Sequence, residues 1–221
     1  MAMQSSFKNM TVCLLTICVV CSALLAGVYA LTKEPIDAAA AAKNEAAIKE
    51  VLPESAVTIE EERTVEYEGQ TYSYNLAYDE VGNVVGCAIN VAPVGFGGPI
   101  AIKVGFNADG VIWNTKVLSQ AETPGLGAKC VEPSFADQFK GFDVTRKKLA
   151  VKKDGGDVDA ITASTITSRA YADGLATAVN VLAAIAGTPM LLDSTTGATS
   201  ATPVIPNEVT PVIPSEVEES K

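Results

Sequence analysis

The fold is decided by residues 100–118, which read Ile100-Ala-Ile-Lys-Val-Gly-Phe106, then Asn107-Ala-Asp-Gly110, then Val111-Ile-Trp-Asn-Thr-Lys-Val-Leu118. Two segments rich in β-branched and apolar residues flank an Asp-Gly pair. This arrangement is a strong short-range signal for a β-hairpin, because Asp and Gly accept the backbone conformations that a tight turn needs. The sequence therefore predicts paired strands over 100–106 and 111–118.

Further strands are predicted upstream of this hairpin. From Val57 onward, polar and apolar residues alternate with the period of a half-buried strand. Turn-forming residues stand at Glu68-Gly-Gln70 and at Asp79-Glu-Val-Gly-Asn83. The predicted strands are Thr58–Glu60, Thr64–Tyr67, Thr71–Tyr78 and Val84–Val91.

The sequence downstream of the hairpin predicts helices. Ser134 to Phe139 fits a short helix, and a long helix follows Ile161-Thr-Ala-Ser-Thr165 and ends at Gly187 and Pro189. Apolar residues of the long helix recur every three or four positions and share one core-facing side. They are Tyr171, Leu175, Ala178, Leu182 and Ile185. Strands first and one closing helix, with connections too short for repeated crossovers, predict an α+β domain with a mixed or antiparallel sheet closed by a long C-terminal helix.

An apolar run stands near the N-terminus. Val12 to Leu31 contains no charged residue, and its length matches the hydrocarbon core of a bilayer. Lys8 and Lys33 flank the run, and Tyr29 stands where an interfacial aromatic residue stabilises a span. We therefore predict a transmembrane helix. A cleaved signal peptide is the alternative, because Val28-Tyr29-Ala30 resembles a small-residue cleavage site. The flanking lysines do not by themselves decide the topology.

The sequence divides into five parts. They are a short N-terminal segment (1–11), the transmembrane helix (12–31), a helical stalk (32–53), the main domain (54–192) and a disordered tail (193–221). Pro35 suits the first turn of the alanine-rich stalk helix, and Pro53 stops it. The alanine run could instead be an ordinary helix packed on the domain. The tail is rich in Thr, Ser, Pro, Glu and Val, a composition that forms no core.

The composition excludes several classes of function. The net charge is −10, and all acidic residues follow residue 31. An acidic domain without a basic stripe disfavours nucleic acid, whose phosphates are bound by Lys and Arg. The chain has no histidine, which excludes Ser-His-Asp and Cys-His catalysis and removes the commonest metal ligand. Cys13, Cys18 and Cys21 lie in the apolar run. Cys87 and Cys130 lack the spacing of a metal site, and form either one disulfide or two unpaired, half-buried thiols.

Three segments carry the function. In order, they are Val94-Gly-Phe-Gly-Gly-Pro-Ile100, Glu122-Thr-Pro-Gly-Leu-Gly-Ala-Lys129 and Asp159-Ala-Ile-Thr-Ala-Ser-Thr-Ile-Thr-Ser168. They resemble the patterns G-[YF]-G-G-x-I, E-T-P-G-L-G-A and D-x-I-[ST]-G-A-T-x-T-S of the FMN-binding domain found in the G subunit of Rnf complexes and in its relative NqrC of the sodium-pumping quinone reductase. Each segment alone is typical of a loop, turn or helix cap. Their order and spacing, with the core motif region at 94–187 and Thr32-Lys-Glu-Pro-Ile36 after the apolar run, carry the resemblance.

The resemblance implies that FMN is esterified through its phosphate to Thr165. A hydroxyl at the junction of a short strand and a helix suits a phosphate, because free N–H groups and the helix dipole favour negative charge there. Gly125 and Gly127 would let a second backbone segment approach the cofactor, with Pro124 stiffening the turn. The predicted cofactor-binding residues are Thr165, Thr162, Ser164, Thr167, Ser168, Glu122, Thr123, Gly125, Leu126 and Gly127. No catalytic or metal-binding residue is predicted.

The sequence departs from the family patterns at two places. Ala163 and Ser164 stand where the family has Gly and Ala, and Ser119-Gln-Ala121 stands where many relatives have a histidine. Ala163 and Ser164 are both small, so access to the Thr165 hydroxyl should survive. A second copy of the spacing, Asp193-Ser-Thr-Thr-Gly-Ala-Thr199, matches T-G-A-T, but no helix is predicted to follow it. We therefore expect the flavin at Thr165 and not at Thr199.

The resemblance implies an electron-carrying redox subunit, not catalytic alone, of a complex that exchanges electrons between ferredoxin and NAD and couples this to ion transport. The implied partners are the other membrane subunits and an FMN-attaching transferase. The implied location is the inner (cytoplasmic) membrane, with one span and the soluble domain on the extracytoplasmic side. Three alternatives are an NqrC-like subunit, a stand-alone FMN-binding sensor or carrier, and a cofactor-free anchored scaffold.

Overall fold

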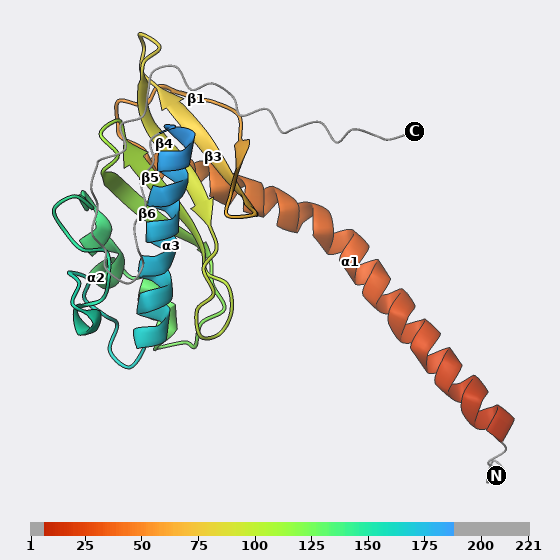
Figure 1. Ribbon diagram of the computed structural model, residues 1–221. Helices are drawn as coiled ribbons and strands as arrows, with labels where there is room; N and C mark the ends of the chain where they lie inside the picture. Colours follow the sequence, from red (N-terminus) through yellow and green to blue (C-terminus); the bar gives the residue numbers. More distant parts are fainter. Residues whose placement is uncertain (1–6, 188–221) are drawn as a thin grey trace, which may run out of the picture. The chain divides into compact units, whose positions relative to one another are not determined.

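The computed structural model describes residues 7–187. The chain forms two compact units, residues 1–45 and 46–221. The described part of the first unit is helical, and the second unit contains a sheet and one long helix (Figure 1). The predicted α+β class, with an N-terminal apolar helix, an antiparallel sheet and a closing C-terminal helix, is confirmed. The predicted tail at 193–221 and the second motif copy ending at Thr199 lie outside the described residues.

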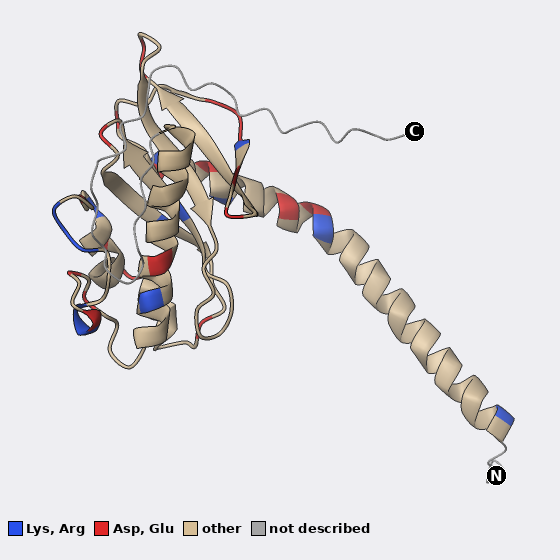
Figure 2. Ribbon diagram, viewed as in Figure 1, with Lys and Arg blue, Asp and Glu red and all other residues tan. Residues whose placement is uncertain are grey.

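Helix α1 spans Phe7–Val51 without interruption. Figure 2 shows its uncharged stretch between Lys8 and Lys33. Large apolar side chains there are exposed, and this helix is long and apolar enough to cross a membrane. Pro35 lies inside α1, so the expectation that a helix starts there was wrong. Proline removes one hydrogen bond of the helical ladder, and the alanine run at 38–42, which has the highest helix propensity, continues the helix.

The end of α1 belongs to the second unit and packs on its sheet. The residues of this apolar cluster are Ile48, Val51, Leu52, Ala77 and Ala88. The helix backbone comes so close to the sheet that a Cβ atom at Gly105 would lie 1.9 Å from the Val51 carbonyl oxygen. The last turn of α1 therefore packs on the domain, while the alanine run at 38–42 is exposed and its role as a stalk stays a prediction.

A six-stranded sheet forms the centre of the domain. Its strands are β1 (Thr58–Ile59), β2 (Arg63–Tyr67), β3 (Gln70–Tyr78), β4 (Val84–Val91), β5 (Ala101–Asn107) and β6 (Ile112–Ser119). The strand order is β1-β3-β4-β5-β6, with β2 also paired to β3, and every pair is antiparallel. Each predicted strand agrees with the structure to within one residue at either end. Short turns connect β2 to β3, β3 to β4 and β5 to β6, whereas residues 92–100 connect β4 to β5 and β1 pairs with β3 rather than with β2. Local patterns therefore decide most of this topology.

Helix α3 (Thr165–Ile185) lies across one face of the sheet (Figure 1). The predicted apolar stripe is buried, from Tyr171 at 0% to Ile185 at 8% exposed. It meets strand residues such as Ile102 and Phe106 in one core cluster. Burying each such side chain contributes roughly 1.5–3 kcal/mol. The Tyr171 hydroxyl donates to Thr115 Oγ1 at 2.9 Å, so its polar atom is paired inside the core.

Short helical segments occupy the connection from β6 to α3. They are η1 (Gly127–Val131), α2 (Pro133–Ala136), η2 (Asp137–Phe139) and η3 (Lys152–Asp154). The predicted short helix at 134–139 is thus split into α2 and η2. The rings of Phe135 and Phe139 pack on Tyr171 with centroid distances of 5.2 and 5.0 Å. This aromatic cluster attaches the connection to α3.

The short strand expected before Thr165 does not form. The structure has a single bridge between Val151 and Val158 there, and a turn in which Ser164 N–H donates to the Ile161 carbonyl. The backbone around Val158 bonds within its own loop, because Val158 N–H donates to the Ala150 carbonyl. Thr165 therefore follows a turn and not a strand.

Cys87 and Cys130 are both buried and unpaired. The alternative of two thiols is therefore correct, although both are fully and not half buried. Burial raises the pKa of both thiols, that of Cys130 to about 11 with a further contribution from Glu122. Neither thiol is in the reactive thiolate form near neutral pH.

Candidate functional site

The N-terminus of α3 presents free backbone donors. Thr165 is the first residue of the helix, and the N-cap residue Ser164 makes no side-chain cap hydrogen bond. Ser168 N–H donates to the Ser164 carbonyl at 3.1 Å, so the N–H groups of the three residues between them have no helical acceptor. Thr165 is half-buried, and its hydroxyl bonds to no residue within 7–187. This end of the helix favours an anion.

The turn before α3 places Ala163 in the left-handed region, with φ of 61°. A side chain in this conformation costs roughly 1–2 kcal/mol, because its Cβ crowds the following carbonyl oxygen. Glycine avoids that cost. The geometry therefore explains why the resembled pattern has Gly at this position.

Glu122 connects the three functional segments. Its side chain is buried, with 6% of the residue exposed. Oε1 accepts a hydrogen bond from Gly97 N–H at 2.9 Å, and Oε2 accepts one from the Thr167 hydroxyl at 2.6 Å. Gly97 belongs to the first segment, Glu122 to the second and Thr167 to the third. One carboxylate thus joins all three.

Two glycines pack directly against this carboxylate. A Cβ atom at Gly95 would lie 2.2 Å from Glu122 Oε1. A Cβ atom at Gly127 would lie 2.3 Å from Oε2 and 2.6 Å from Thr167 Oγ1. Gly125 is different, because it has open space around it and a left-handed φ of 76°. In the second segment, Gly127 therefore lets the backbone lie close to Glu122, and Gly125 forms a turn.

A cavity of about 370 Å³ lies between the three segments. It is lined by Phe96, Glu122, Thr123, Leu126, Gly127, Ala163, Ser164, Thr165, Ile166 and Thr167. Three of these are large apolar side chains that remain exposed, with Phe96 at 71%, Leu126 at 42% and Ile166 at 53%. Each comes from a different segment. The cavity therefore combines an apolar surface with the uncapped end of α3.

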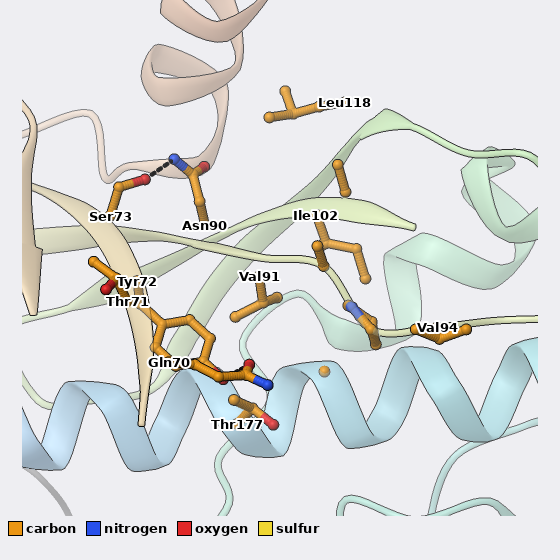
Figure 3. Close-up of a pocket in the computed structure, with 14 residues that line it drawn as sticks. Gln70, Thr71, Tyr72, Ser73, Asn90, Val91, Val94, Ile102, Leu118 and Thr177 are labelled. Carbon is orange, nitrogen blue, oxygen red and sulfur yellow. Dashed lines mark hydrogen bonds between the residues drawn. The ribbon is translucent and has the colours of Figure 1, made fainter. Parts of the chain in front are cut away.

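A larger cavity, about 580 Å³, lies at the ends of β3 to β6 beside the middle of α3 (Figure 3). Its lining carries no charged residue, and Asn90 donates to Ser73 Oγ at 2.7 Å on one side of it. Thr177 of α3 lies on the other side. None of the predicted site residues lines this cavity.

Comparison with known proteins identifies the family. Residues 95–180 match the family model of the FMN-binding domain, and residues 1–51 match that of the RnfG N-terminal region. The G subunit of the ion-translocating oxidoreductase complex of Methanosarcina acetivorans is 35% identical over 193 residues, which cover 85% of this chain and 100% of that protein. This chain belongs to the G-subunit family of ion-translocating oxidoreductase complexes. The resemblance inferred from the three segments is confirmed.

Other similar proteins share less of the chain. The G subunit of the ion-translocating oxidoreductase complex of Haemophilus influenzae is 34% identical over 170 residues, 70% of this chain and 79% of that protein. The G subunit of the Na(+)-translocating ferredoxin:NAD(+) oxidoreductase complex of Acetobacterium woodii is 38% identical over 105 residues, 45% of this chain and 50% of that protein. The C subunit of the Na(+)-translocating NADH-quinone reductase from Parabacteroides distasonis is similar in structure, with a TM-score of 0.42 and 24% identity over 56% of this chain and 76% of that one.

Most site residues predicted for this family member converge on the smaller cavity. Those that line it are Glu122, Thr123, Leu126, Gly127, Ser164, Thr165 and Thr167. Thr162 and Gly125 are exposed and outside the lining, and Ser168 is fully buried. Phe96, Ala163 and Ile166 line the cavity and were missed. Phe96 and Ile166 could have been found as apolar residues in a loop and a first helical turn, where no core requires them.

Two hydroxyls that were predicted to face a phosphate make internal hydrogen bonds. The Ser168 hydroxyl accepts from Ile161 N–H at 2.9 Å and donates to the Ser164 carbonyl at 3.0 Å. The Thr167 hydroxyl donates to Glu122. The Ser168 bonds stabilise the turn before α3, and the Thr167 bond joins the first turn of α3 to Glu122. Donation from these hydroxyls to a phosphate stays a prediction.

Proposed function

We propose that this protein carries FMN, esterified through its phosphate to Thr165, and acts as a membrane-anchored electron carrier of an Rnf-type ferredoxin:NAD oxidoreductase complex. The observation that carries the proposal is the convergence of the three family segments on one cavity, with the Thr165 hydroxyl at the end of α3 and unbonded within residues 7–187. The relative from Acetobacterium woodii is named for a ferredoxin:NAD(+) oxidoreductase complex.

The residues of this cavity fit both parts of FMN. The uncapped N–H groups of α3 favour a phosphate beside Thr165. The exposed side chains of Phe96, Leu126 and Ile166 offer apolar contact to a flat ring system. The volume, about 370 Å³, is within the ~300–1,000 Å³ of ligand pockets. FMN, when bound, accepts and releases electrons at its ring, and the protein supplies its position and surroundings.

A separate transferase is needed to form the ester. The Thr165 oxygen must attack the phosphorus of an activated flavin nucleotide, so that an O–P bond forms while the phosphoanhydride bond to the leaving nucleotide breaks. The hydroxyl proton must pass to a base, because a neutral hydroxyl is a weak nucleophile. No residue within 7–187 accepts a hydrogen bond from this hydroxyl. The transferase must therefore supply the base as well as the activated nucleotide.

Ion transport belongs to partner subunits under this proposal. The span of α1 carries no charged side chain between Lys8 and Lys33, and ion pathways in membranes are marked by such side chains. We place the span in the inner (cytoplasmic) membrane and the domain on its extracytoplasmic side. A covalent bond would retain FMN in a compartment where no free pool replaces it.

The experiment tests the bond directly. The full chain is produced in cells that contain an FMN-attaching transferase, denatured, separated on a gel and viewed under ultraviolet light. We expect a fluorescent band for the wild type and for Thr177→Ala, a hydroxyl control in the middle of the same helix. Thr165→Ala should be dark but folded, because the Thr165 hydroxyl makes no internal hydrogen bond within residues 7–187. A dark wild-type band, or a fluorescent Thr165→Ala band, would overturn the proposal. Peptide mass mapping distinguishes Thr165 from Thr199.

A further inference from the structure

We propose that Glu122 is the positioning residue of this site, acting through Gly97 and Thr167 and not through a bond to the cofactor. The identity of the cofactor rests on the proposed function, but the contacts do not. An ionised carboxylate only accepts hydrogen bonds, and it repels a phosphate or a reduced, anionic ring. A role other than direct binding of the phosphate must therefore explain why a carboxylate lines this cavity.

The first reason is the loop that carries Phe96. This loop leaves β4 and returns to β5, and Val94 and Pro99 form a bridge across it. Gly95 N–H donates to the Gly98 carbonyl and Ile100 N–H to the Pro93 carbonyl, each at 2.8 Å. At its tip, Gly97 N–H donates to Glu122 Oε1. That hydrogen bond attaches the tip of the loop to the Glu122 side chain, beside a close approach in which a Cβ atom at Gly97 would lie 2.1 Å from the Ala121 carbonyl oxygen.

The second reason is the first turn of α3. Thr167 is 1% exposed, and its hydroxyl donates to Glu122 Oε2. Thr165 and Ile166 immediately precede it and line the cavity. A side chain that holds Thr167 therefore also fixes where the Thr165 oxygen lies relative to the loop of Phe96.

The surroundings of Glu122 leave it little freedom. A Cβ atom at Gly95 or Gly127 would lie 2.2 or 2.3 Å from a Glu122 carboxylate oxygen, so both glycines pack tightly against this side chain. The Glu122 backbone N–H also donates to Gln120 Oε1 at 2.6 Å. Within residues 7–187, no Lys or Arg forms an ion pair with Glu122. Its charge is compensated by the two donors that it holds, so the donors and the carboxylate fix one another.

The first test uses the full chain in detergent, produced without a transferase, so that no flavin is present. We expect Glu122→Ala to raise the amide hydrogen-exchange rate of Gly97 roughly tenfold, because its acceptor is lost, while the strands keep their protection. Glu122→Gln should restore protection, since its carbonyl accepts from Gly97 and its NH₂ donates to the Thr167 hydroxyl. Unchanged protection of Gly97 in Glu122→Ala would overturn the proposal.

The second test separates position from charge by flavin loading in the presence of a transferase. Glu122→Gln keeps the geometry without the charge and should load close to the wild-type level. Glu122→Asp keeps the charge but is one methylene shorter, so it cannot reach both donors and should load several-fold less. The reverse order, or equal loading of all variants, contradicts the proposal.

Ile48→Ala, a core change on the opposite face of the sheet, is the control for general destabilisation and should stay loaded. A wild type without flavin would refute the proposed function alone, and the exchange test would still decide the role of Glu122.

Discussion

The Thr167 hydroxyl donates to Oε2 of Glu122 at 2.6 Å across 45 positions of sequence, and both side chains are buried. This contact joins the loop after β6 to the first turn of α3. The carboxylate belongs to the E-T-P-G-L-G-A segment and the hydroxyl to the segment that contains Thr165. Two motifs that look independent in the sequence thus form one structural unit.

Thr167→Val should lower stability measurably. The change keeps the shape of the side chain and removes the donor, which leaves a buried carboxylate oxygen unpaired. Hydrogen bonds to charged groups contribute about 1.5–3 kcal/mol, so we expect a loss of this size in the free energy of unfolding. Thr177→Val, on the same helix with its hydroxyl bonded to the Asp173 carbonyl of the preceding turn, is the control and should change stability by less than about 0.5 kcal/mol. Equal denaturation curves for the two variants would contradict the assigned contact.

Gly127→Ala should disrupt the same contact from the other side. The added methyl would lie 2.3 Å from Glu122 Oε2 and 2.6 Å from Thr167 Oγ1, so both atoms must move. Overpacking of this kind costs about 1–3 kcal/mol, and we expect flavin loading to fall along with thermal stability. Gly125→Asn is the comparison, because Asn tolerates the left-handed backbone of that open position. It should remain close to wild type in a melting experiment.

Ala163→Gly should stabilise the protein. Ala163 has a φ of 61°, where the Cβ is unfavourable, and glycine removes that strain at the cost of a more flexible unfolded chain. We expect a net gain of about 0.5–1 kcal/mol, with flavin loading retained. Ala160→Gly, in the same loop without a left-handed backbone, should instead lose about 0.4–1 kcal/mol. If both changes were destabilising, the strain assigned to Ala163 would be absent.

The sequence predicted the fold closely because each element has a local cause. The alternation in β3 and the Asp-Gly turn before β6 are both readable within a few residues. The buried stripe from Tyr171 to Ile185 was readable for the same reason. The continuity of α1 through Pro35 was missed, because a proline weakens a helix without always ending it.

The site was predicted as three segments but not as a network. The hydrogen bonds of Glu122 join residues 25 and 45 positions away, and no local pattern predicts such contacts. The strain at Ala163 and the exposure of Phe96 also depend on the folded backbone. Resemblance therefore named Thr165 and its neighbours, and the geometry showed which of them hold the others in place.

Lys103 is a second buried residue of a charged type, and its amine has no hydrogen-bond partner in the described part of the chain. It lies in the middle of β5 and is 0% exposed, and its Nζ bonds to no residue within 7–187. Asn90, its cross-strand neighbour on β4, also has an unpaired buried side-chain oxygen. Burial lowers the pKa of Lys103, while Glu62 and Cys87 act in the opposite direction. This amine is therefore a source of instability that depends on pH.

Lys103→Met should stabilise the protein at neutral pH, because methionine fills a similar length without a charge. We expect a gain of about 1 kcal/mol or more in the free energy of unfolding.

The folded pKa of Lys103 is below its unfolded value of about 10.4. Between these two values the unfolded chain binds more protons, so the free energy of unfolding of the wild type rises with pH there. The stability advantage of Lys103→Met over the wild type should therefore shrink as the pH rises towards the unfolded pKa of Lys103, about 10.4. Denaturant unfolding of both proteins across this range tests the prediction. The titrations of the tyrosines and of Cys130 are common to both proteins and cancel in the difference, whereas Cys87 interacts with Lys103 and contributes to the measured difference. A difference that stays constant with pH would show that Lys103 has an ordinary pKa in the folded protein.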